Sequence, residues 1–479
     1  MKPEAKRYDL LVVGAGPAGM HAALLADEAG LRVAVVDEQA AAGGQIFRQP
    51  PASFAAPESS AFASYPFGRE LLAKAKAAQR IDWYFATSAW GAFTDVQDGI
   101  RLAINAADGA GVLRARKLLI ATGAYDLPVP FPGWTLPGVM SAGGVQTLLK
   151  SQFLRSAQRY VLVGSHPLQL LLASQLLDAG AHIAEVAIAR PRPRLGELMA
   201  GCKALPGNVR LFAQLGGILF KLWRHRVPVR FSTLITQASG TEGVEQVTLS
   251  QADDEWQVLP GTERTHQVDG LAVGYGLLAS TELARQAGCA VSWKPQRGGW
   301  VVKHDAHMRT SNPDIYVAGE PASVAGAQAA YCQGRVAGLA VIRALKPEAA
   351  DSAREQAAHQ ALEKTKPFAD TVARFFAPRL DALARLADTT TLICRCEDVS
   401  VGQVKGFLQA HPHVSSVNSV KLACRSGMGP CQGRYCQHTV AHLVADSRGI
   451  PVANTGAYTA QAPVKPVPLA HLAVLQLED

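Results

Sequence analysis

Short apolar runs alternate with helical segments along most of the chain. Residues 9–13 (DLLVV) have the pattern of a buried parallel strand. The glycine turn 14–19 (GAGPAG) follows, and residues 20–29 then show helical periodicity until Gly30 ends the segment. A second apolar run at 31–36 completes the pattern, so the start of the chain predicts a βαβ unit.

The same alternation returns later in the chain. The pattern predicts a strand at 118–121, a second βαβ-like unit at 160–189, strand-rich sequence at 227–275, a strand at 315–318 and a helix at 325–345. Alternation of strands with helices predicts an α/β protein whose parallel sheets are covered by helices. Two such units predict two dinucleotide-binding (Rossmann-like) domains.

Length and charge narrow the class of protein. A chain of 479 residues, 48% of them apolar, is long enough for two to four domains. The net charge of +8 includes two basic runs, at 190–194 and 221–230, each of which is either a solvated face or a docking face for an acidic protein partner. No recognised nucleic-acid motif accompanies this charge, so we expect no nucleic-acid ligand.

No targeting or membrane segment is evident. The first residues lack the apolar region and cleavage site of a signal peptide. The most apolar stretch, 160–177, contains His166 and Pro167 and follows a strand-then-helix pattern, which is typical of a buried βα unit rather than a transmembrane span. We therefore expect a cytoplasmic protein.

The first glycine turn carries the chemistry of a dinucleotide site. Gly14 permits the tight turn, Gly16 lets backbone amides approach a pyrophosphate, and Gly19 lets the helix pack closely on the strand. The helix N-terminus then presents unpaired N–H groups to the phosphates. Asp37, 18 residues after Gly19, is placed to bind ribose hydroxyls. A glycine turn without a ligand is the alternative, and the complete βαβ context argues against it.

The corresponding turn of the second unit is altered. It reads Gly164-Ser-His166-Pro-Leu-Gln169, so only the first glycine is kept. The His166 side chain stands where backbone should meet a pyrophosphate, and Gln169 occupies the close-packing position. The second strand ends at Arg190 instead of an acidic residue. This turn predicts a degenerate, non-binding fold, with an NADP or other nucleotide site as the alternative.

Four cysteines near the C-terminus predict a metal centre. Cys394-x-Cys396 is followed after 34 residues by Cys431-x4-Cys436, and clustering in a chain without a signal peptide points to metal rather than disulfides. Both zinc and a [2Fe–2S] cluster accept four thiolates. The nearby glycines supply amides that could donate to the sulfurs, which favours the cluster.

The remaining cysteines and two histidines have simpler predictions. Cys424 lies seven residues before Cys431, and Cys202, Cys289 and Cys332 are isolated thiols for which a buried structural role is expected. No C-x-x-C pair is present, so the dithiol of disulfide reductases is missing. His438 and His442, one turn apart after the last cysteine, are predicted to lie on a helix surface.

Residues 7–345 resemble the flavoprotein reductases that contain two dinucleotide folds. The matching motifs are the first GAGPAG turn, Gly-Gly-Gln at 43–45, Ala-Thr-Gly at 121–123 and Ile-Tyr-Val-Ala-Gly-Glu at 315–320. The family usually has Asp at the position of Glu320. The resemblance implies FAD in the first fold, bound by Gly14, Gly16, Pro17, Ala18, Gly19, Asp37, Glu38, Gly44, Gln45, Thr122, Gly123, Gly319 and Glu320.

The cysteine region resembles the bacterioferritin-associated-ferredoxin type of [2Fe–2S] domain. Cys394-Arg-Cys396-Glu and Gly-Met-Gly-Pro-Cys431-Gln-Gly-Arg-Tyr-Cys436 carry this resemblance, which implies that these four cysteines bind the cluster. A flavin fold, an altered second fold and this domain together resemble the family of opine oxidase A subunits. That family also includes hydrogen cyanide synthase B subunits and subunits of dye-linked proline or D-hydroxyproline dehydrogenases.

The resemblance implies a domain order and a function. We expect an FAD-binding domain at 1–155 and 270–345, a degenerate second nucleotide domain at 156–269, a helical connector at 346–389, a [2Fe–2S] domain at 390–445 and a tail at 446–479. The expected function is that of the flavin and iron–sulfur subunit of a heteromeric dehydrogenase. A separate FAD-containing, amine-oxidase-like subunit would oxidise a secondary amine or amino acid, and the electrons would pass to an acceptor such as a quinone.

Several features of this function stay open. An FMN between subunits, membrane association through the acceptor and a small additional [2Fe–2S] subunit are all compatible with the resemblance. A self-sufficient NAD(P)H-dependent reductase, a hydrogen cyanide synthase subunit that oxidises glycine, and a non-enzymatic scaffold with a structural metal are the alternatives. No residue of this chain stands out as a catalytic acid, base or nucleophile.

Overall fold

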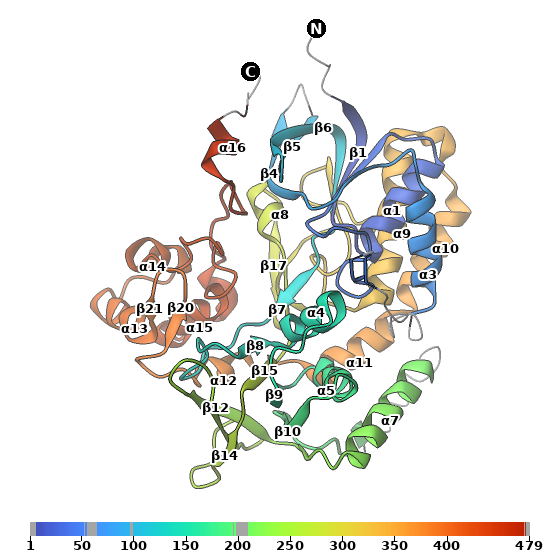
Figure 1. Ribbon diagram of the computed structural model, residues 1–479. Coiled ribbons are helices and arrows are strands. Elements are labelled where there is room, and N and C mark those ends of the chain that lie inside the picture. The colour runs from blue at the N-terminus through green and yellow to red at the C-terminus, as the bar shows by residue number, and fades with distance from the viewer. Residues whose placement is uncertain are drawn as a thin grey trace. The chain divides into compact units, whose positions relative to one another are not determined.

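The computed structural model describes residues 6–51, 53–54, 65–95, 99–194, 196–197, 209–473 and 475. The chain forms two compact units (Figure 1). Unit 1 comprises Met1–Ala124, Ala279–Asp370 and Thr459–Asp479, and unit 2 comprises Tyr125–Leu278 and Thr371–Tyr458. The chain therefore passes twice through each unit before it ends in unit 1.

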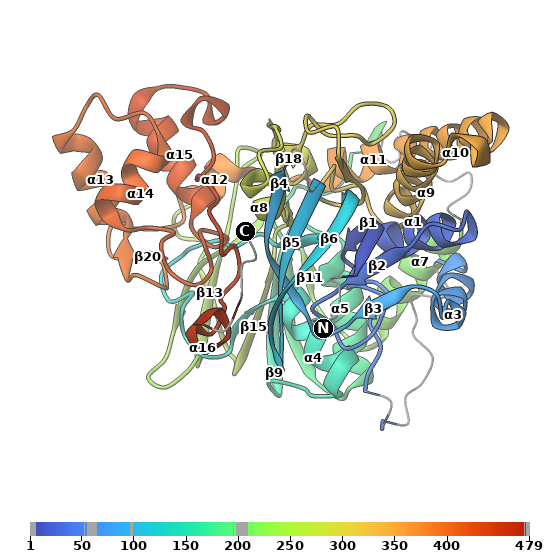
Figure 2. The same cartoon turned by 90° about the horizontal axis from the view of Figure 1, so that it is seen from above.

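Unit 1 is built on a seven-stranded sheet of order β3-β2-β1-β6-β5-β4, with β19 paired to β6 (Figure 2). The strands are β1 (Arg7–Val13), β2 (Val33–Val36), β3 (Asp82–Tyr84), β4 (Ser88–Asp95), β5 (Gly99–Ala106), β6 (Gly109–Ile120) and β19 (Ile315–Val317). β1, β2, β3, β6 and β19 pair in parallel, whereas β4, β5 and the start of β6 form an antiparallel meander.

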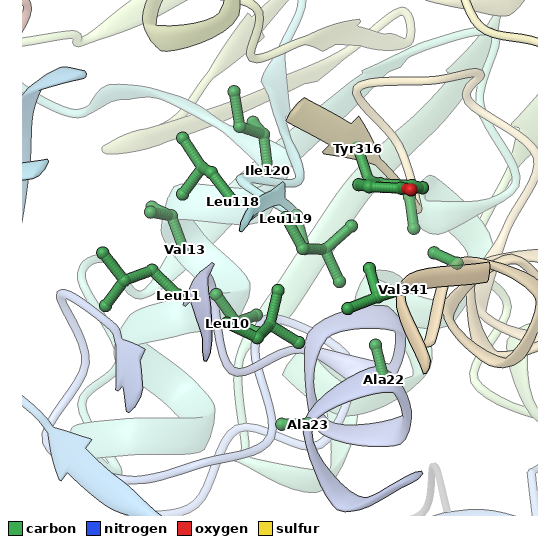
Figure 3. Packing of buried hydrophobic residues seen from close by; sticks show 14 of the residues in the cluster. Leu10, Leu11, Val13, Ala22, Ala23, Leu118, Leu119, Ile120, Tyr316 and Val341 are labelled. Atoms are coloured by element: carbon green, nitrogen blue, oxygen red, sulfur yellow. The ribbon is translucent and has the colours of Figure 1, made fainter. Parts of the chain in front are cut away.

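Four long helices of unit 1 contribute to the apolar core of this sheet. They are α1 (Pro17–Glu28), α3 (Phe67–Ala77), α9 (Ala327–Leu345) and α10 (Ser352–Glu363). Figure 3 shows apolar side chains of β1 and β6 meeting those of α1 and α9, and nearly all of these residues are fully buried. The C-terminal parts of β1 (10–13, LLVV) and β6 (118–120, LLI) are continuous apolar runs because both faces of a parallel strand are covered there.

Two glycines bring α9 unusually close to α1. A Cβ at Gly334 would lie 2.2 Å from the backbone oxygen of Ala18, and one at Gly338 would lie 2.9 Å from the Cα of Ala22. The two helices therefore touch backbone to backbone. This contact fixes the start of α9 beside the glycine turn that precedes α1.

Unit 1 also contains smaller elements. They are α8 (Glu282–Gln286), the hairpin β17 (Val291–Lys294) and β18 (Gly299–Val302) with η1 (Pro295–Arg297) between its strands, η2 (Pro347–Ala349) and α16 (Leu469–Ala473). The C-terminal tail packs on this unit: the backbone N–H of Val464 donates to the oxygen of Trp90 at 2.8 Å, and the His471 ring bonds Asn105 at 2.7 Å.

Unit 2 contains a five-stranded parallel sheet of order β11-β10-β9-β15-β8. The strands are β8 (Val139–Ser141), β9 (Arg159–Gly164), β10 (His182–Ile188), β11 (Val229–Arg230) and β15 (Gly270–Gly274), and the helices beside them are α4 (Ala142–Gln152), α5 (Leu168–Asp178) and α7 (Val209–Arg224). An antiparallel sheet of β12 (Thr233–Ser239), β13 (Gln246–Gln251) and β14 (Arg264–Gln267) adjoins them in sequence.

Residues 125–155 belong to unit 2, whereas the sequence pattern grouped them with the first domain. The reason is that β8 pairs with β15, and β15 lies within the second sheet. β7 (Ala124–Asp126) and β16 (Leu277–Ala279), where the chain passes between the units, pair with each other.

The cysteine region forms a small helical domain within unit 2. It contains α12 (Leu380–Ala384), β20 (Leu392–Cys394), β21 (Val399–Ser400), α13 (Val401–Ala410), α14 (Val417–Cys424), α15 (Gln437–Arg448) and η3 (Val452–Thr455), and it has its own apolar core. α11 (Lys366–Phe376) precedes it in the chain. Within the described residues, no helix has both the length and the apolar character needed to cross a bilayer.

Candidate flavin and iron–sulfur sites

The first glycine turn needs glycine at two positions for reasons internal to the chain. Gly14 has φ of +107°, and a Cβ there would lie 2.2 Å from the oxygen of Ala121. A Cβ at Gly19 would lie 1.8 Å from the oxygen of Gly14. A side chain at either position would force β1 and α1 apart, so these glycines shape the turn itself.

Gly16 differs from its two neighbours. A Cβ at Gly16 would meet only the Cα of Gly44, at 3.9 Å, and the residue has an ordinary negative φ. It is also the N-cap of α1, and no side chain caps the helix there. Free N–H groups at a helix N-terminus, with open space in front of them, are what a pyrophosphate requires. The turn therefore fits a dinucleotide. Pro17 and Ala18 open α1 directly behind it.

Asp37 ties the end of β2 to this turn. Its carboxylate accepts hydrogen bonds from the backbone N–H groups of Ala15, at 2.5 Å, and Gln39, at 2.7 Å. Burial raises the pKa of Asp37, and these two N–H groups oppose the rise. The neighbouring Glu38 forms an ion pair with Lys465 of the tail, with Nζ and Oε1 3.0 Å apart.

The loop after β2 also reaches the turn. Gly44 has φ of +57°, and a Cβ there would lie 2.8 Å from the Cα of Gly16. Gln45 donates from Nε2 to the oxygen of Ala124 at 2.6 Å. Arg48, which the sequence pattern did not single out, bonds Gln39 at 2.8 Å and carries its charge next to Asp37. The feature of the sequence that could have identified Arg48 is its position in the same loop, four residues after Gly44.

The remaining flavin candidates lie where β6 and β19 end. Thr122 donates from Oγ1 to the oxygen of Ser280 at 2.7 Å, and Gly123 has φ of +73°. The N–H of Gly319 donates to the side chain of Gln333 in α9 at 2.7 Å. The carboxyl ends of neighbouring parallel strands meet at one edge of a sheet, which is where this architecture binds ligands.

Glu320 turns back onto the loop before α9. Its carboxylate accepts from the N–H groups of Ala325, at 3.1 Å, and Gly326, at 3.2 Å. The residue is partly exposed, but its carboxyl group is surrounded by protein, and this burial raises its pKa to about 7. Unit 1 thus brings all thirteen predicted flavin residues to the turn, to the loop after β2, or to the ends of β6 and β19.

The turn of the second fold is filled by the chain itself. The His166 ring accepts the N–H of Leu168, the first residue of α5, through Nδ1 at 3.3 Å, so its side chain lies at the helix N-terminus where a phosphate would bind. Burial lowers the pKa of His166 to about 4, which leaves the ring neutral at pH 7. Gln169 is fully buried and donates to the oxygen of Val163 at 2.6 Å.

The end of β10 is covered as well. The guanidinium carbon of Arg190 lies 5.0 Å from the centre of the Phe375 ring, and its Nη1 donates to the Phe375 oxygen at 3.1 Å. Its other branch pairs with Glu197 at 2.9 Å. Arg190 lies at the position where a nucleotide ribose or its 2′-phosphate would bind. Its guanidinium already contacts Phe375 and Glu197 of the same chain.

The four predicted cluster cysteines lie together in the small helical domain. The Cys394 thiol interacts with that of Cys436, and the Cys396 thiol with that of Cys431. The hydrogen bond from Cys436, helped by N–H groups of Gly427, Glu397 and Cys396, lowers the pKa of Cys394 to about 6. The donors around this sulfur therefore favour the thiolate, which is the form that binds metal.

This arrangement fits a two-iron cluster. Each iron of a [2Fe–2S] centre takes two thiolates, and the four sulfurs already form two contacting pairs. Cys396 is exposed, whereas Cys394 and Cys436 are buried, so one end of the site faces solvent.

Glycines in the loop before α15 make room for one of the cysteines and for the ring of Tyr458. A Cβ at Gly429 would lie 2.3 Å from the Cβ of Cys396. Gly427 and Gly433 both have positive φ, and a Cβ at either would collide with the ring of Tyr458, at 2.5 and 2.4 Å. Tyr458 is buried and bonds Ser426 at 3.0 Å. The sequence pattern placed Tyr458 in the tail and gave no sign of this supporting role.

Two further predictions have definite outcomes. The prediction that His438 and His442 lie on a helix surface is wrong, since they are 8% and 6% exposed. The reason is that α15 contributes heavily to the core of the domain, and burial lowers the pKa of His438 to about 3. Cys289 and Cys332 are buried, and Cys202 lies outside the described residues. Cys424 is partly buried at the end of α14, and burial raises its pKa.

Comparison with known proteins identifies the family. A family model described as pyridine nucleotide-disulphide oxidoreductase matches residues 8–357, and one described as a BFD-like [2Fe-2S] binding domain matches residues 392–446. The A subunit of opine oxidase from Agrobacterium tumefaciens is 34% identical over 98% of this chain and 92% of its own length. The chain belongs to the family of opine oxidase A subunits.

A further relative and a solved structure are also similar to this chain. The HcnB subunit of hydrogen cyanide synthase from Pseudomonas aeruginosa is 33% identical over 89% of this chain and 90% of its own. The crystal structure of L-proline dehydrogenase from P. horikoshii shares the fold, with a TM-score of 0.70 and 21% identity over 98% of this chain and 80% of that one. The predicted fold class is confirmed: two dinucleotide-binding domains and a C-terminal [2Fe–2S] domain. This member of the family is therefore a flavoprotein oxidoreductase with a [2Fe–2S] domain.

Proposed function

We propose that this chain is the flavin and iron–sulfur subunit of a heteromeric dehydrogenase that oxidises a secondary amine or amino acid of the opine, proline or D-hydroxyproline type. The oxidation takes place on a partner subunit that resembles an FAD-containing amine oxidase. Electrons enter this chain at its flavin and leave through its cluster to an acceptor such as a quinone. No residue of this chain stands out as a catalytic acid, base or nucleophile.

The observation that carries this proposal is the filled second nucleotide fold. A neutral His166 ring occupies the pyrophosphate position, Gln169 occupies the close-packing position, and Arg190 is held by Phe375 and Glu197. A reductase that takes hydride from a nicotinamide needs this site open. Electrons must then come from elsewhere, and a partner in a complex is the source suggested by the relatives, which are themselves subunits.

The residues proposed to hold the cofactors are those that the resemblance implies, and the geometry of the two sites supports this assignment. FAD is held by the turn at Gly14, Gly16, Pro17, Ala18 and Gly19, by Asp37, Glu38, Gly44 and Gln45, and by Thr122, Gly123, Gly319 and Glu320. The cluster is held by Cys394, Cys396, Cys431 and Cys436. When bound, the flavin accepts electrons in pairs and the cluster passes them on singly. The protein's part is to bind these groups and tune them through N–H donors and burial.

Three further components belong to the proposal. The enzyme binds an FMN at the interface between its subunits and includes a small additional [2Fe–2S] subunit. It is cytoplasmic and contacts the membrane only through its electron acceptor. All three features are consistent with the family. A hydrogen cyanide synthase subunit oxidising glycine is a second candidate function, favoured by the similarity to HcnB over most of both chains. Opine oxidase subunits match over a larger share of this chain, so amine or opine oxidation stays the first candidate.

Anaerobic titration of the purified chain with NADH and NADPH tests the proposal. We expect the flavin absorbance to stay unchanged at stoichiometric nicotinamide, and to bleach fully on addition of dithionite, which serves as the control for a reducible flavin. Rapid bleaching by one equivalent of NADH or NADPH would instead identify a self-sufficient reductase. A colourless preparation containing zinc would identify a scaffold with a structural metal.

A further inference from the structure

Helix α7 (Val209–Arg224) has an inner face that belongs to the core of unit 2. Ile218 and Leu222 are buried in the same apolar cluster as Leu172 and Leu176 of α5. Lys221 donates from Nζ to the oxygen of Ser174, at 3.2 Å, and pairs with Asp178. Figure 1 shows α7 running beside α5. The inner side of α7 therefore packs on α5 within unit 2.

The opposite face exposes large apolar side chains. Trp223 is 73% exposed, Phe220 is 62% exposed and Leu219 is 45% exposed. The rings of Phe220 and Trp223 contact each other, with centroids 5.7 Å apart. Single exposed apolar residues are ordinary, but three on one helix end mark a binding surface. We call this set, with the exposed Ala213, Gly216 and Gly217, the outer face of α7.

Two adjacent residues of this outer face are glycines, and no contact within the described residues requires glycine at either position. A Cβ at Gly216 or Gly217 would meet no atom within 4 Å, and neither residue has a positive φ. Alanine would fit at both positions, and glycine is among the least favourable residues inside a helix. Glycine is useful there if another backbone must approach the helix closely.

The rim of this face is basic. Helix α7 contains no acidic residue, and Arg224, His225 and Arg226 are exposed at its C-terminal end. In the described part of the chain, neither Arg224 nor Arg226 forms an ion pair, in contrast to Lys221. A partner that covers the apolar centre must therefore bring acidic groups to the rim, because like charges across an interface are unfavourable.

We infer that the outer face of α7 is the docking site for the partner subunit of the dehydrogenase. The partner presents an apolar segment with an acidic rim, and its backbone lies against Gly216 and Gly217. This inference rests on the proposed function, since it requires that such a partner exists. A second copy of this chain docked through the same face would bring another α7, which contains no acidic residue to meet Arg224 and Arg226. A lipid surface would gain nothing from two glycines.

The affinity between the subunits of the intact complex tests the inference. The complex is purified from its native host through a tag on this chain, the partner is identified as an amine-oxidase-like flavoprotein by mass spectrometry, and dissociation on dilution is followed by mass photometry. Trp223→Asp removes the largest apolar anchor, and Gly217→Leu adds bulk where the partner backbone lies. Leu154→Asp is the matched control, because Leu154 is 54% exposed in the same unit but lies after α4.

We expect Trp223→Asp and Gly217→Leu each to raise the dissociation constant of the complex at least tenfold, while Leu154→Asp leaves it unchanged. Gly217→Leu should also raise the Tm of the isolated chain, so that lost binding is not lost folding. Unchanged affinity in both α7 variants would overturn the inference and leave the proposed function standing. A tagged chain that purifies alone and is bleached by NADPH would overturn both. Binding of the chain, but not of Trp223→Asp, to phosphatidylglycerol vesicles with an unchanged complex would assign the face to a membrane instead.

Discussion

The pKa of Glu320 gives the sharpest stability prediction. Oε2 of Glu320 accepts from the N–H of Ala325 and Oε1 from that of Gly326. Replacing Glu320 with Gln keeps the size of the side chain and one of these two acceptor oxygens, but removes the ionisable group. Burial raises the pKa of Glu320 from 4.5 to about 7 in the chain without flavin. The native state therefore holds a proton that the unfolded state has already lost between these two values.

The sign and size of the effect follow from that difference. Below pH 4.5 both states are protonated and Glu320 contributes no pH dependence. As the pH rises towards 7, ionisation stabilises only the unfolded chain, so native stability falls. A shift of one pKa unit is worth about 1.4 kcal/mol, so the loss reaches about 3 kcal/mol above a pH of about 7. For a domain of about 150–250 residues this corresponds to roughly 6–12 °C in Tm.

Thermal and urea unfolding of the flavin-free chain between about pH 4.5 and about pH 8.5 measures this loss. Stability of the wild type relative to Glu320→Gln should fall by about 3 kcal/mol across this range, with most of the change between about pH 5 and about pH 7. Glu348→Gln, at an exposed position in η2, is the control and should follow the wild type. Parallel curves for the wild type and Glu320→Gln would refute the reasoning, because Glu320 would then ionise as it does in water.

Two other predictions concern packing and the cluster. Gly334→Val should destabilise unit 1 by about 3 kcal/mol, because its Cβ would lie 2.2 Å from the Ala18 oxygen. Gly406→Ala in α13 is the control, because a Cβ there meets nothing within 4 Å. It should raise the free energy of unfolding by about 1 kcal/mol in the same urea measurement. If both substitutions changed the free energy of unfolding equally, the close contact between α1 and α9 would be contradicted. Cys396→Ser and Cys431→Ser should abolish the iron content and the visible absorption of the cluster. Cys424→Ser should keep both, and loss of iron in that variant would show that the ligand set is assigned incorrectly.

Local signals explain what the sequence alone could predict. The turn from Gly14 to Gly19 is recognisable because a strand, a turn and a helix follow each other within a few residues, and the structure shows that Gly14 and Gly19 are needed by their immediate neighbours. The cluster cysteines are recognisable because each pair, Cys394-x-Cys396 and Cys431-x4-Cys436, is closely spaced, although 34 residues separate the two pairs. In both cases the recognisable signal comes from residues close together in the chain.

The features that sequence reasoning missed depend on distant segments. Phe375 reaches Arg190 from 185 residues away, and Tyr458 supports a loop that begins at Gly427. Helical spacing predicts His438 and His442 on a surface because it does not show which face the rest of a domain will cover, and here both side chains are buried. In the region of α7 the sequence showed only the basic run at 221–230, and the structure shows that the glycines and aromatic residues of the helix share an exposed face.

The central claim is that electrons reach this chain from an amine-oxidising partner and not from a nicotinamide. The most direct measurement is anaerobic electron paramagnetic resonance of the purified complex after addition of L-proline, D-hydroxyproline, an opine, glycine or NADPH. The account predicts that one of the amines reduces the flavin and produces the signal of a reduced [2Fe–2S] cluster, that this signal is absent in Cys396→Ser, and that NADPH produces none. A cluster signal that appears with NADPH and with none of the amines would contradict it.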